Sequence, residues 1–126
     1  MKFVCLIYAE SMLEQMFPAV AEQHMREYAG FIDDIRKSGH YLGCSRLLPP
    51  QSAVTLRVRD GKTSVTDGPW VETKEQLGGF FMIEAKDRDE AVRIAARIPC
   101  AQAGCVEIRT IAEDALTMET LGLNPV

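Results

Sequence analysis

The sequence of 126 residues lacks a long uninterrupted hydrophobic run. After Lys2 only seven apolar residues precede Glu10, which is too short for the apolar core and cleavage site of a signal peptide. No stretch approaches the roughly 18 apolar residues that a membrane-spanning helix needs. We therefore expect a cytoplasmic protein with no membrane partner.

Clustered positive charge is also missing. The chain has 14 Lys and Arg against 18 Asp and Glu, a formal net charge of -4, and no three consecutive basic residues. A nucleic-acid surface requires a basic patch or stripe on one face of the domain. We therefore expect no nucleic-acid partner.

The four cysteines and two histidines do not have the spacing of a metal site. There is no CxxC pair, and Cys100 and Cys105 stand five positions apart across an expected loop. Zinc ligand sets normally show their spacing in the sequence, and disulfides are rare in the cytoplasm. The expectation is four reduced thiols, no metal and no cofactor.

Hydrophobic periodicity predicts a single domain over residues 1–111, followed by a C-terminal tail over residues 112–126 that forms a short helix. Strands are predicted at 2–9, 40–47, 77–85 and 105–111, a hairpin at 54–66, and helices at 19–38 and 87–98. Without the hairpin this order is βαββαβ. The fold class is therefore α+β, ferredoxin-like, with the helices on one face of a mainly antiparallel sheet.

Two of these strands, 2–9 and 77–85, are apolar on both faces. Two helices cover only one face of a sheet, so the other face needs a different cover. We expect a homodimer whose sheets pack face to face, forming a dimeric α/β-barrel. The alternative is that the tail folds back over the open face, although it is short beside strands of about 20 Å.

A charged segment, VTDGPWVETKEQLGGFFMIEA, leads into the third strand of the sheet. Asp67, Glu72, Lys74 and Glu75 fall within nine positions, and the Gly78-Gly79 step lets a ligand or backbone approach closely. Asp67 has two interpretations: a general base at a pocket mouth, or a cap of its own turn. The other three either bind substrate or form a solvated surface.

His24 and Tyr28 lie one turn apart on the apolar stripe of the first helix. Histidine is the side chain best suited to proton transfer at neutral pH, so His24 is a candidate catalytic residue and Tyr28 a candidate substrate contact. The alternative is that both pack in the core. Tyr8 ends the first strand and is a further candidate substrate contact, or a core residue with its hydroxyl at the rim.

The run TDGPWVETKEQLGGFFMIEAKDRDEA resembles the YCII-related family, in particular its DGPF branch. In that branch a Thr-Asp-Gly-Pro-aromatic turn leads into Glu-Thr-Lys-Glu and a Gly-Gly strand; here the aromatic is Trp70. MKFVCLIYAE is similar to the family's opening strand, and AVRIAARIPCAQAGCVEIRTI to its second helix and last strand. The resemblance covers about residues 1–111.

The resemblance implies a dimeric α/β-barrel and an enzyme with a His-Asp pair in a cleft, and one branch is associated with elimination chemistry. Asp67 matches the motif aspartate, and His24 is the histidine that the first helix offers. The first hypothesis is a small cofactor-independent enzyme, lyase-like or hydrolytic, in which Asp67 and His24 share acid-base chemistry on a small polar or aromatic molecule. The alternative is a non-catalytic dimeric module that binds a small ligand or a protein.

Overall fold

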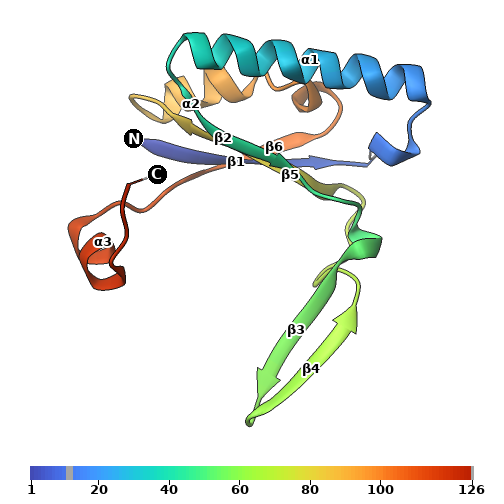
Figure 1. Ribbon diagram of the computed structural model, residues 1–126, viewed down its shortest axis with the longest axis vertical. Coiled ribbons are helices and arrows are strands. Elements are labelled where there is room, and N and C mark those ends of the chain that lie inside the picture. The colour runs from blue at the N-terminus through green and yellow to red at the C-terminus, as the bar shows by residue number, and fades with distance from the viewer. Residues whose placement is uncertain (11–12, 126) are drawn as a thin grey trace.

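A four-stranded antiparallel sheet in the order β2-β5-β1-β6 forms the centre of the protein, as the computed structural model of residues 1–10 and 13–125 shows (Figure 1). Its strands are β1 (Lys2–Ala9), β2 (Tyr41–Arg46), β5 (Gln76–Glu84) and β6 (Cys105–Thr110). β1 pairs with β5 and β6, and β2 pairs with β5. The predicted α+β, ferredoxin-like architecture is confirmed.

Two helices, α1 (Pro18–Lys37) and α2 (Arg88–Ala95), cover one face of this sheet (Figure 1). α1 begins at a proline, whose fixed φ suits the first helical turn. α2 begins after Asp87, whose carboxylate accepts a hydrogen bond from the Glu90 backbone N–H. Across the described residues, no helix is both long enough and apolar enough to cross a membrane.

The second helix is shorter than predicted. The sequence pattern extends it to Ile98, whereas α2 ends at Ala95. The backbone N–H groups of Arg97 and Ile98 bond carbonyls three residues earlier, so the chain tightens before Pro99. The described residues also contain three short 3₁₀ helices: Leu13–Gln15, Pro50–Ser52 and, shortly after α2, Pro99–Gln102.

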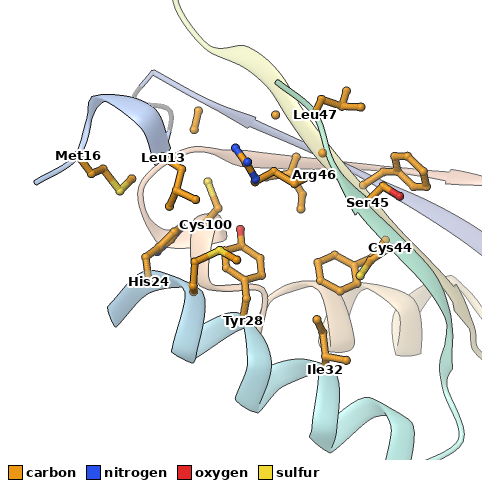
Figure 2. A pocket seen from close by; sticks show the side chains of 17 residues that line it. Leu13, Met16, His24, Tyr28, Ile32, Cys44, Ser45, Arg46, Leu47 and Cys100 are labelled. Carbon is orange, nitrogen blue, oxygen red and sulfur yellow. The ribbon is translucent and has the colours of Figure 1, made fainter. Parts of the chain in front are cut away.

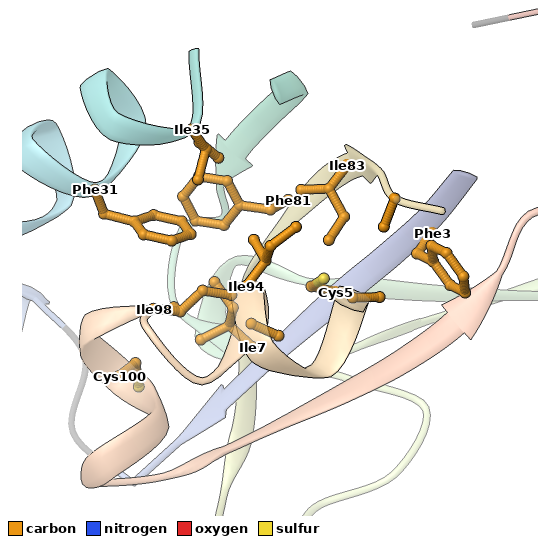
Figure 3. Packing of buried hydrophobic residues seen from close by; sticks show 13 residues of the cluster. Phe3, Cys5, Ile7, Phe31, Ile35, Phe81, Ile83, Ile94, Ile98 and Cys100 are labelled. Carbon is orange, nitrogen blue, oxygen red and sulfur yellow. The ribbon is translucent and has the colours of Figure 1, made fainter. Parts of the chain in front are cut away.

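The core lies between the two helices and the sheet (Figure 3). Alternate residues of β1 and β5 face it, and α1 contributes Phe31 and Ile35. The buried hydrophobic residues are Phe3, Cys5, Ile7, Phe31, Ile35, Phe81, Ile83, Ala85, Ala91, Ile94, Ala95, Ile98 and Cys100.

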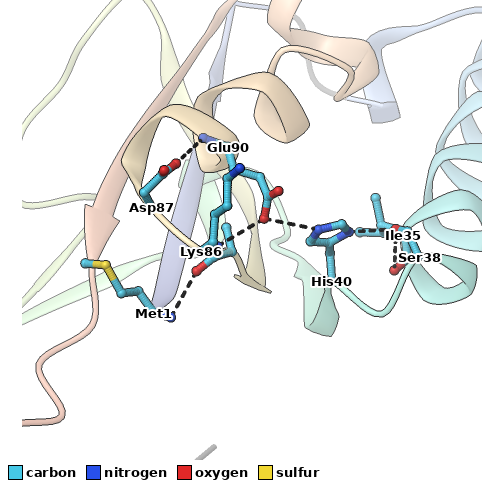
Figure 4. A network of polar contacts seen from close by, with 8 residues as sticks. Met1, Ile35, Ser38, His40, Lys86, Asp87 and Glu90 are labelled. Atoms are coloured by element: carbon cyan, nitrogen blue, oxygen red, sulfur yellow. Dashed lines mark hydrogen bonds and ion pairs between the residues drawn. The ribbon is translucent and has the colours of Figure 1, made fainter.

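A polar junction joins the end of α1 to the start of α2 (Figure 4). The Nδ1 atom of His40 lies 2.7 Å from the Ser38 hydroxyl, and its Nε2 atom lies 3.3 Å from a carboxylate oxygen of Glu90. That same oxygen accepts the Lys86 backbone N–H at 3.0 Å. The junction fixes the two helices relative to one another at the end of the sheet remote from the pocket described below.

The opposite face of the sheet is open. Val4 and Leu6 of β1 pair with Met82 and Phe80 of β5, and all four alternate with core residues, so they point away from the helices. The two central strands therefore present half-exposed apolar side chains on this face, and β6 borders them with Glu107 and Arg109, the residues paired with Leu6 and Val4.

Two elements project from the side of this open face (Figure 1). The hairpin of β3 (Val54–Arg59) and β4 (Lys62–Asp67) turns at Asp60 and Gly61, which both have positive φ as a tight hairpin turn requires. The tail forms α3 (Ala115–Leu121), next to the start of β1. The hairpin lies at the opposite end, so neither element covers the middle of the open face.

Candidate functional site

A pocket of about 200 Å³ opens between α1, the ends of β2 and β5, and the Pro99–Gln102 turn (Figure 2). Most of its lining is apolar, and the polar groups come from a few side chains. The lining residues are Ile7, Ala9, Leu13, Met16, His24, Met25, Tyr28, Ile32, Cys44, Ser45, Arg46, Leu47, Gly78, Gly79, Phe80, Phe81 and Cys100.

The floor of this pocket depends on a glycine. A Cβ atom on Gly79 would stand 2.7 Å from the Ser45 carbonyl oxygen, closer than real Cβ contacts allow. Gly79 therefore lets β2 lie close beside β5 and leaves space above the strand. The predicted close approach at the Gly-Gly step is confirmed, and the closely approaching group is a backbone.

Tyr28 stands in the pocket with its hydroxyl pointing toward the sheet (Figure 2). Its ring stacks on Phe81 with 6.1 Å between centroids. Burial raises the pKa of the Tyr28 phenol far above its ordinary value, and the hydroxyl also bonds Cys100. The phenol therefore stays protonated and is a hydrogen-bond donor in an apolar environment.

His24 lies one helical turn before Tyr28, as its spacing predicts, and its ring contacts the Tyr28 ring edge-on with 4.9 Å between centroids. The Nδ1 atom of His24 is 3.9 Å from a carboxylate oxygen of Glu27. His24 is partly buried at the pocket wall.

Cys100 forms the back of the pocket. Burial raises the pKa of its thiol, the Tyr28 hydrogen bond lowers it, and the charges of Cys105 and Glu75 raise it again. A protonated, buried thiol is a poor nucleophile, so Cys100 shapes the pocket. Glu75, a predicted site residue, does not line the pocket.

Asp67, Glu72 and Lys74 line a separate, wider and more open hollow of about 640 Å³ at the base of the hairpin. Lys74 there lies 3.4 Å from a carboxylate oxygen of Glu10. The hollow adjoins the pocket along β5, because Gln76 lines one and Gly78 the other.

The exposed Asp67 carboxylate makes no hydrogen bond or ion pair within the described residues. The turn is held by others: the Gly68 N–H donates to Ala53, and the Thr55 hydroxyl donates to the Gly68 carbonyl. A cap of its own turn is therefore not the arrangement found, and Asp67 remains available for other contacts.

The structure thus brings the predicted residues into two groups. His24 and Tyr28 share the pocket, and Asp67, Glu72 and Lys74 share the hollow. Tyr8 lines neither of them. The sequence analysis did not identify Arg46 and Cys100 as lining residues. The sequence places Arg46 near the end of a predicted strand and Cys100 just after a predicted helix, and neither position by itself indicates a pocket.

Over the described parts of the chain, no three His, Cys, Asp or Glu side chains come together in a group that could hold a metal ion.

The fold and the matching sequence define a family. The model of the YCII-related domain matches residues 1–114, so the chain belongs to the YCII-related family. It is also 38% identical over 93 residues to "Uncharacterized protein R00369" of Rhizobium meliloti (strain 1021), covering 72% of this chain and 75% of that protein. The predicted family is confirmed, and its DGPF branch stays a prediction.

A solved structure has the same fold. It is 5-chloro-2-hydroxyhydroquinone dehydrochlorinase (TftG) from Burkholderia phenoliruptrix AC1100, in complex with 2,5-dihydroxybenzoquinone. The match has a TM-score of 0.50 and 13% sequence identity, and covers 90% of this chain and 96% of that one. At this identity the likeness concerns the fold.

Proposed function

We propose that this protein is a small enzyme that carries out acid-base chemistry, of elimination or hydrolytic type, on a small aromatic or polar molecule. The observation that carries the proposal is the apolar pocket under α1, in which His24 and the protonated Tyr28 phenol lie side by side. A cavity of about 200 Å³ suits a molecule of about one ring.

The two side chains have complementary parts in this reaction. His24 Nε2 accepts a proton from the bound molecule, and the Glu27 carboxylate beside Nδ1 stabilises the resulting imidazolium. Tyr28 donates a hydrogen bond to the substrate oxygen on which negative charge develops. Elimination is the class we test first, because the solved structure of the same fold is described as a dehydrochlorinase.

Asp67 is proposed to share the acid-base work from the adjoining hollow. Its carboxylate is exposed and unbonded within the described residues, and the hollow meets the pocket along β5. In this arrangement Glu72, Lys74 and Glu75 orient the part of the substrate that extends beyond the pocket. Tyr8, near the end of β1, is proposed as a further substrate contact.

Turnover by two variants tests this function. With 5-chloro-2-hydroxyhydroquinone as the probe and chloride release as the readout, His24→Gln and Asp67→Asn should each lower kcat by about 100-fold or more. Both should melt within a few degrees of the wild type, because each side chain is at least partly exposed. Wild-type rates in His24→Gln would contradict the proposal.

A matched control lies on the same helix. Glu22 is exposed and pairs with Arg26 at 2.6 Å, away from the pocket lining. Glu22→Gln should therefore retain the wild-type rate. A rate reduced in Glu22→Gln as much as in His24→Gln would indicate a general effect of changing α1.

The mainly apolar lining favours a second candidate, a module that binds a small ligand or a protein without catalysis. On that reading 2,5-dihydroxybenzoquinone or a similar ring would raise the melting temperature, and none of the hydroxylated or chlorinated rings tested would be converted. A larger side chain that fills the pocket would then abolish ligand binding, and Asp67→Asn would leave binding unchanged.

The quaternary state belongs to the same proposal. The open face of Val4, Leu6, Phe80 and Met82 supports a homodimer in which two sheets pack face to face. α3 stands at one end of this face, so the alternative cover, a tail folded across it, has no support from the position of the tail (Figure 1).

A further inference from the structure

The outer hairpin has one apolar face with nothing packed on it. Alternation along β3 puts Val54, Leu56 and Val58 on the same side, and Val65 of β4 lies directly opposite Leu56. All four side chains are more than half exposed. A two-stranded hairpin is marginally stable by itself, so a face of this composition indicates a missing partner surface.

The tail also carries uncovered apolar side chains, spread around α3 and the residues after it. Leu116, Leu121 and Leu123 are half or more exposed in and after α3. This short helix is tied to the sheet by the ion pair from Lys2 to Glu113 at 3.1 Å. Hairpin and α3 therefore project from the same side of the sheet, one at each end of the open face (Figure 1).

The two surfaces carry opposite charge. Residues 56–63 at the outer end of the hairpin contain Arg57, Arg59 and Lys62 against one acid, Asp60. Residues 112–125 contain Glu113, Asp114 and Glu119 and no basic residue. Long basic side chains reach around the edge of a hairpin, so they can flank an apolar contact made by its other face.

Symmetry leaves two simple ways to pack two open faces together. With the two-fold axis along the strands, each hairpin meets the other hairpin and each α3 meets the other α3, which brings like charges together. With the axis across the strands, the ends exchange, and each hairpin meets the partner's α3. Only the second arrangement pairs basic with acidic surfaces.

We propose that the occupant of the hairpin's apolar face is α3 of a second copy of this chain. The inference rests on the face-to-face dimer proposed above and adds which elements meet. The dimer then contains this contact twice. The hairpin of one protomer covers α3 of its partner, and the partner's hairpin covers α3 of the first protomer. Leu56 and Leu116 are exposed side chains of the two contacting elements.

Cross-linking of two single-cysteine variants tests the pairing. In a Cys105→Ser background, which removes the exposed thiol, Leu56→Cys chains carrying a short mass tag are mixed with Leu116→Cys chains and treated with a short bis-maleimide. We expect a cross-linked product that contains one chain of each kind. Leu56→Cys alone should give the background seen for the Cys105→Ser parent.

A control thiol lies on the other face of the same hairpin. Ser64 pairs with Arg57, so its side chain points away from the apolar face. Ser64→Cys mixed with Leu116→Cys should cross-link at least tenfold less than the Leu56→Cys mixture. Equal yields from both would overturn the assignment of the contacting face.

The possible failures are distinguishable. A dimer in which Leu56→Cys cross-links to itself would overturn the hairpin-to-α3 pairing and retain the face-to-face dimer. A monomer at micromolar concentration would overturn both, with the pocket chemistry still measurable by the rate of His24→Gln. Salt screens attraction between opposite charges, so added salt should make the dimer dissociate more readily. A dimer that dissociates less readily as salt is added would also contradict the pairing.

Discussion

Single glycines decide how closely the strands of this protein approach their neighbours. A Cβ atom on Gly104 would stand 2.0 Å from the Tyr8 carbonyl oxygen, and one on Gly79 would stand 2.7 Å from that of Ser45. Both obstructing atoms belong to backbone, which cannot swing aside as a side chain does. These two positions therefore admit only glycine without a shift of a strand.

We predict that Gly104→Ala destabilises the protein by about 3 kcal/mol, because β1 must move away from the turn before β6. Thermal or denaturant unfolding measures the change. The matched control is Gly30→Ala within α1, where an added Cβ has no atom within 4 Å. That control should gain about 0.5–1 kcal/mol from helix propensity. A neutral Gly104→Ala would contradict the argument.

Residues close in sequence were predictable, and residues brought together by the fold were not. The spacing of His24 and Tyr28 predicted their contact, since helical neighbours meet whatever the rest of the chain does. Cys100 reaches Tyr28 only through the docking of a later turn against α1. Asp67 and His24 were grouped by family resemblance, and the fold of one chain puts them in different hollows.

At the scale of elements, periodicity predicted the helices and strands well because each has one face in the core. It failed at the end of α2, where the apolar residue Ile98 is buried by a 3₁₀-like turn instead of a helical one. The pattern of burial is the same for both conformations there. Periodicity alone could not distinguish them.

The cap of α3 gives an expected pH dependence. Hydrogen bonds from the Thr117 hydroxyl and backbone N–H lower the pKa of Asp114 below its ordinary 3.8. The folded pKa is thus below the unfolded one, so the stabilisation is complete above about pH 4 and is lost as the pH falls through the folded pKa.

We predict that Asp114→Asn, which retains a capping acceptor, flattens the acid limb of hydrogen exchange at α3 amide groups. Amide hydrogen exchange at α3, measured between pH 2 and pH 5, reports the loss of the stabilisation that the cap provides. Asp89→Asn, at an exposed position of α2 without this cap, is the control and should keep the wild-type profile at α3. An unchanged acid limb in Asp114→Asn would contradict the assignment.

At the scale of the whole molecule, the sequence predicted a sheet with one face uncovered, because β1 and β5 alternate between two apolar sides. It could not predict where the hairpin and the tail would stand. Their placement at the two ends of the open face depends on the strand order β2-β5-β1-β6, which is set by pairing across the whole chain.

We predict that the protein elutes with twice the mass of one chain in light scattering at micromolar concentration. Leu6→Glu would place a charge in the middle of the open face, opposite Phe80, and should shift the mass to that of a single chain. Arg93→Glu, exposed on α2 at the other face of the sheet, should leave the mass unchanged. A wild-type monomer would contradict the face-to-face packing.

The pairing of β1 also decides when this protein can fold during its synthesis. Lys2 pairs with Glu84, and Phe3 pairs with Thr110, so β1 has no complete neighbouring strand until about 80 further residues have been synthesised. At roughly 5–20 residues per second this interval lasts about 4–16 s. Throughout it the apolar sides of β1 have no sheet neighbour to cover them, so this interval is when the growing chain exposes the most apolar strand surface.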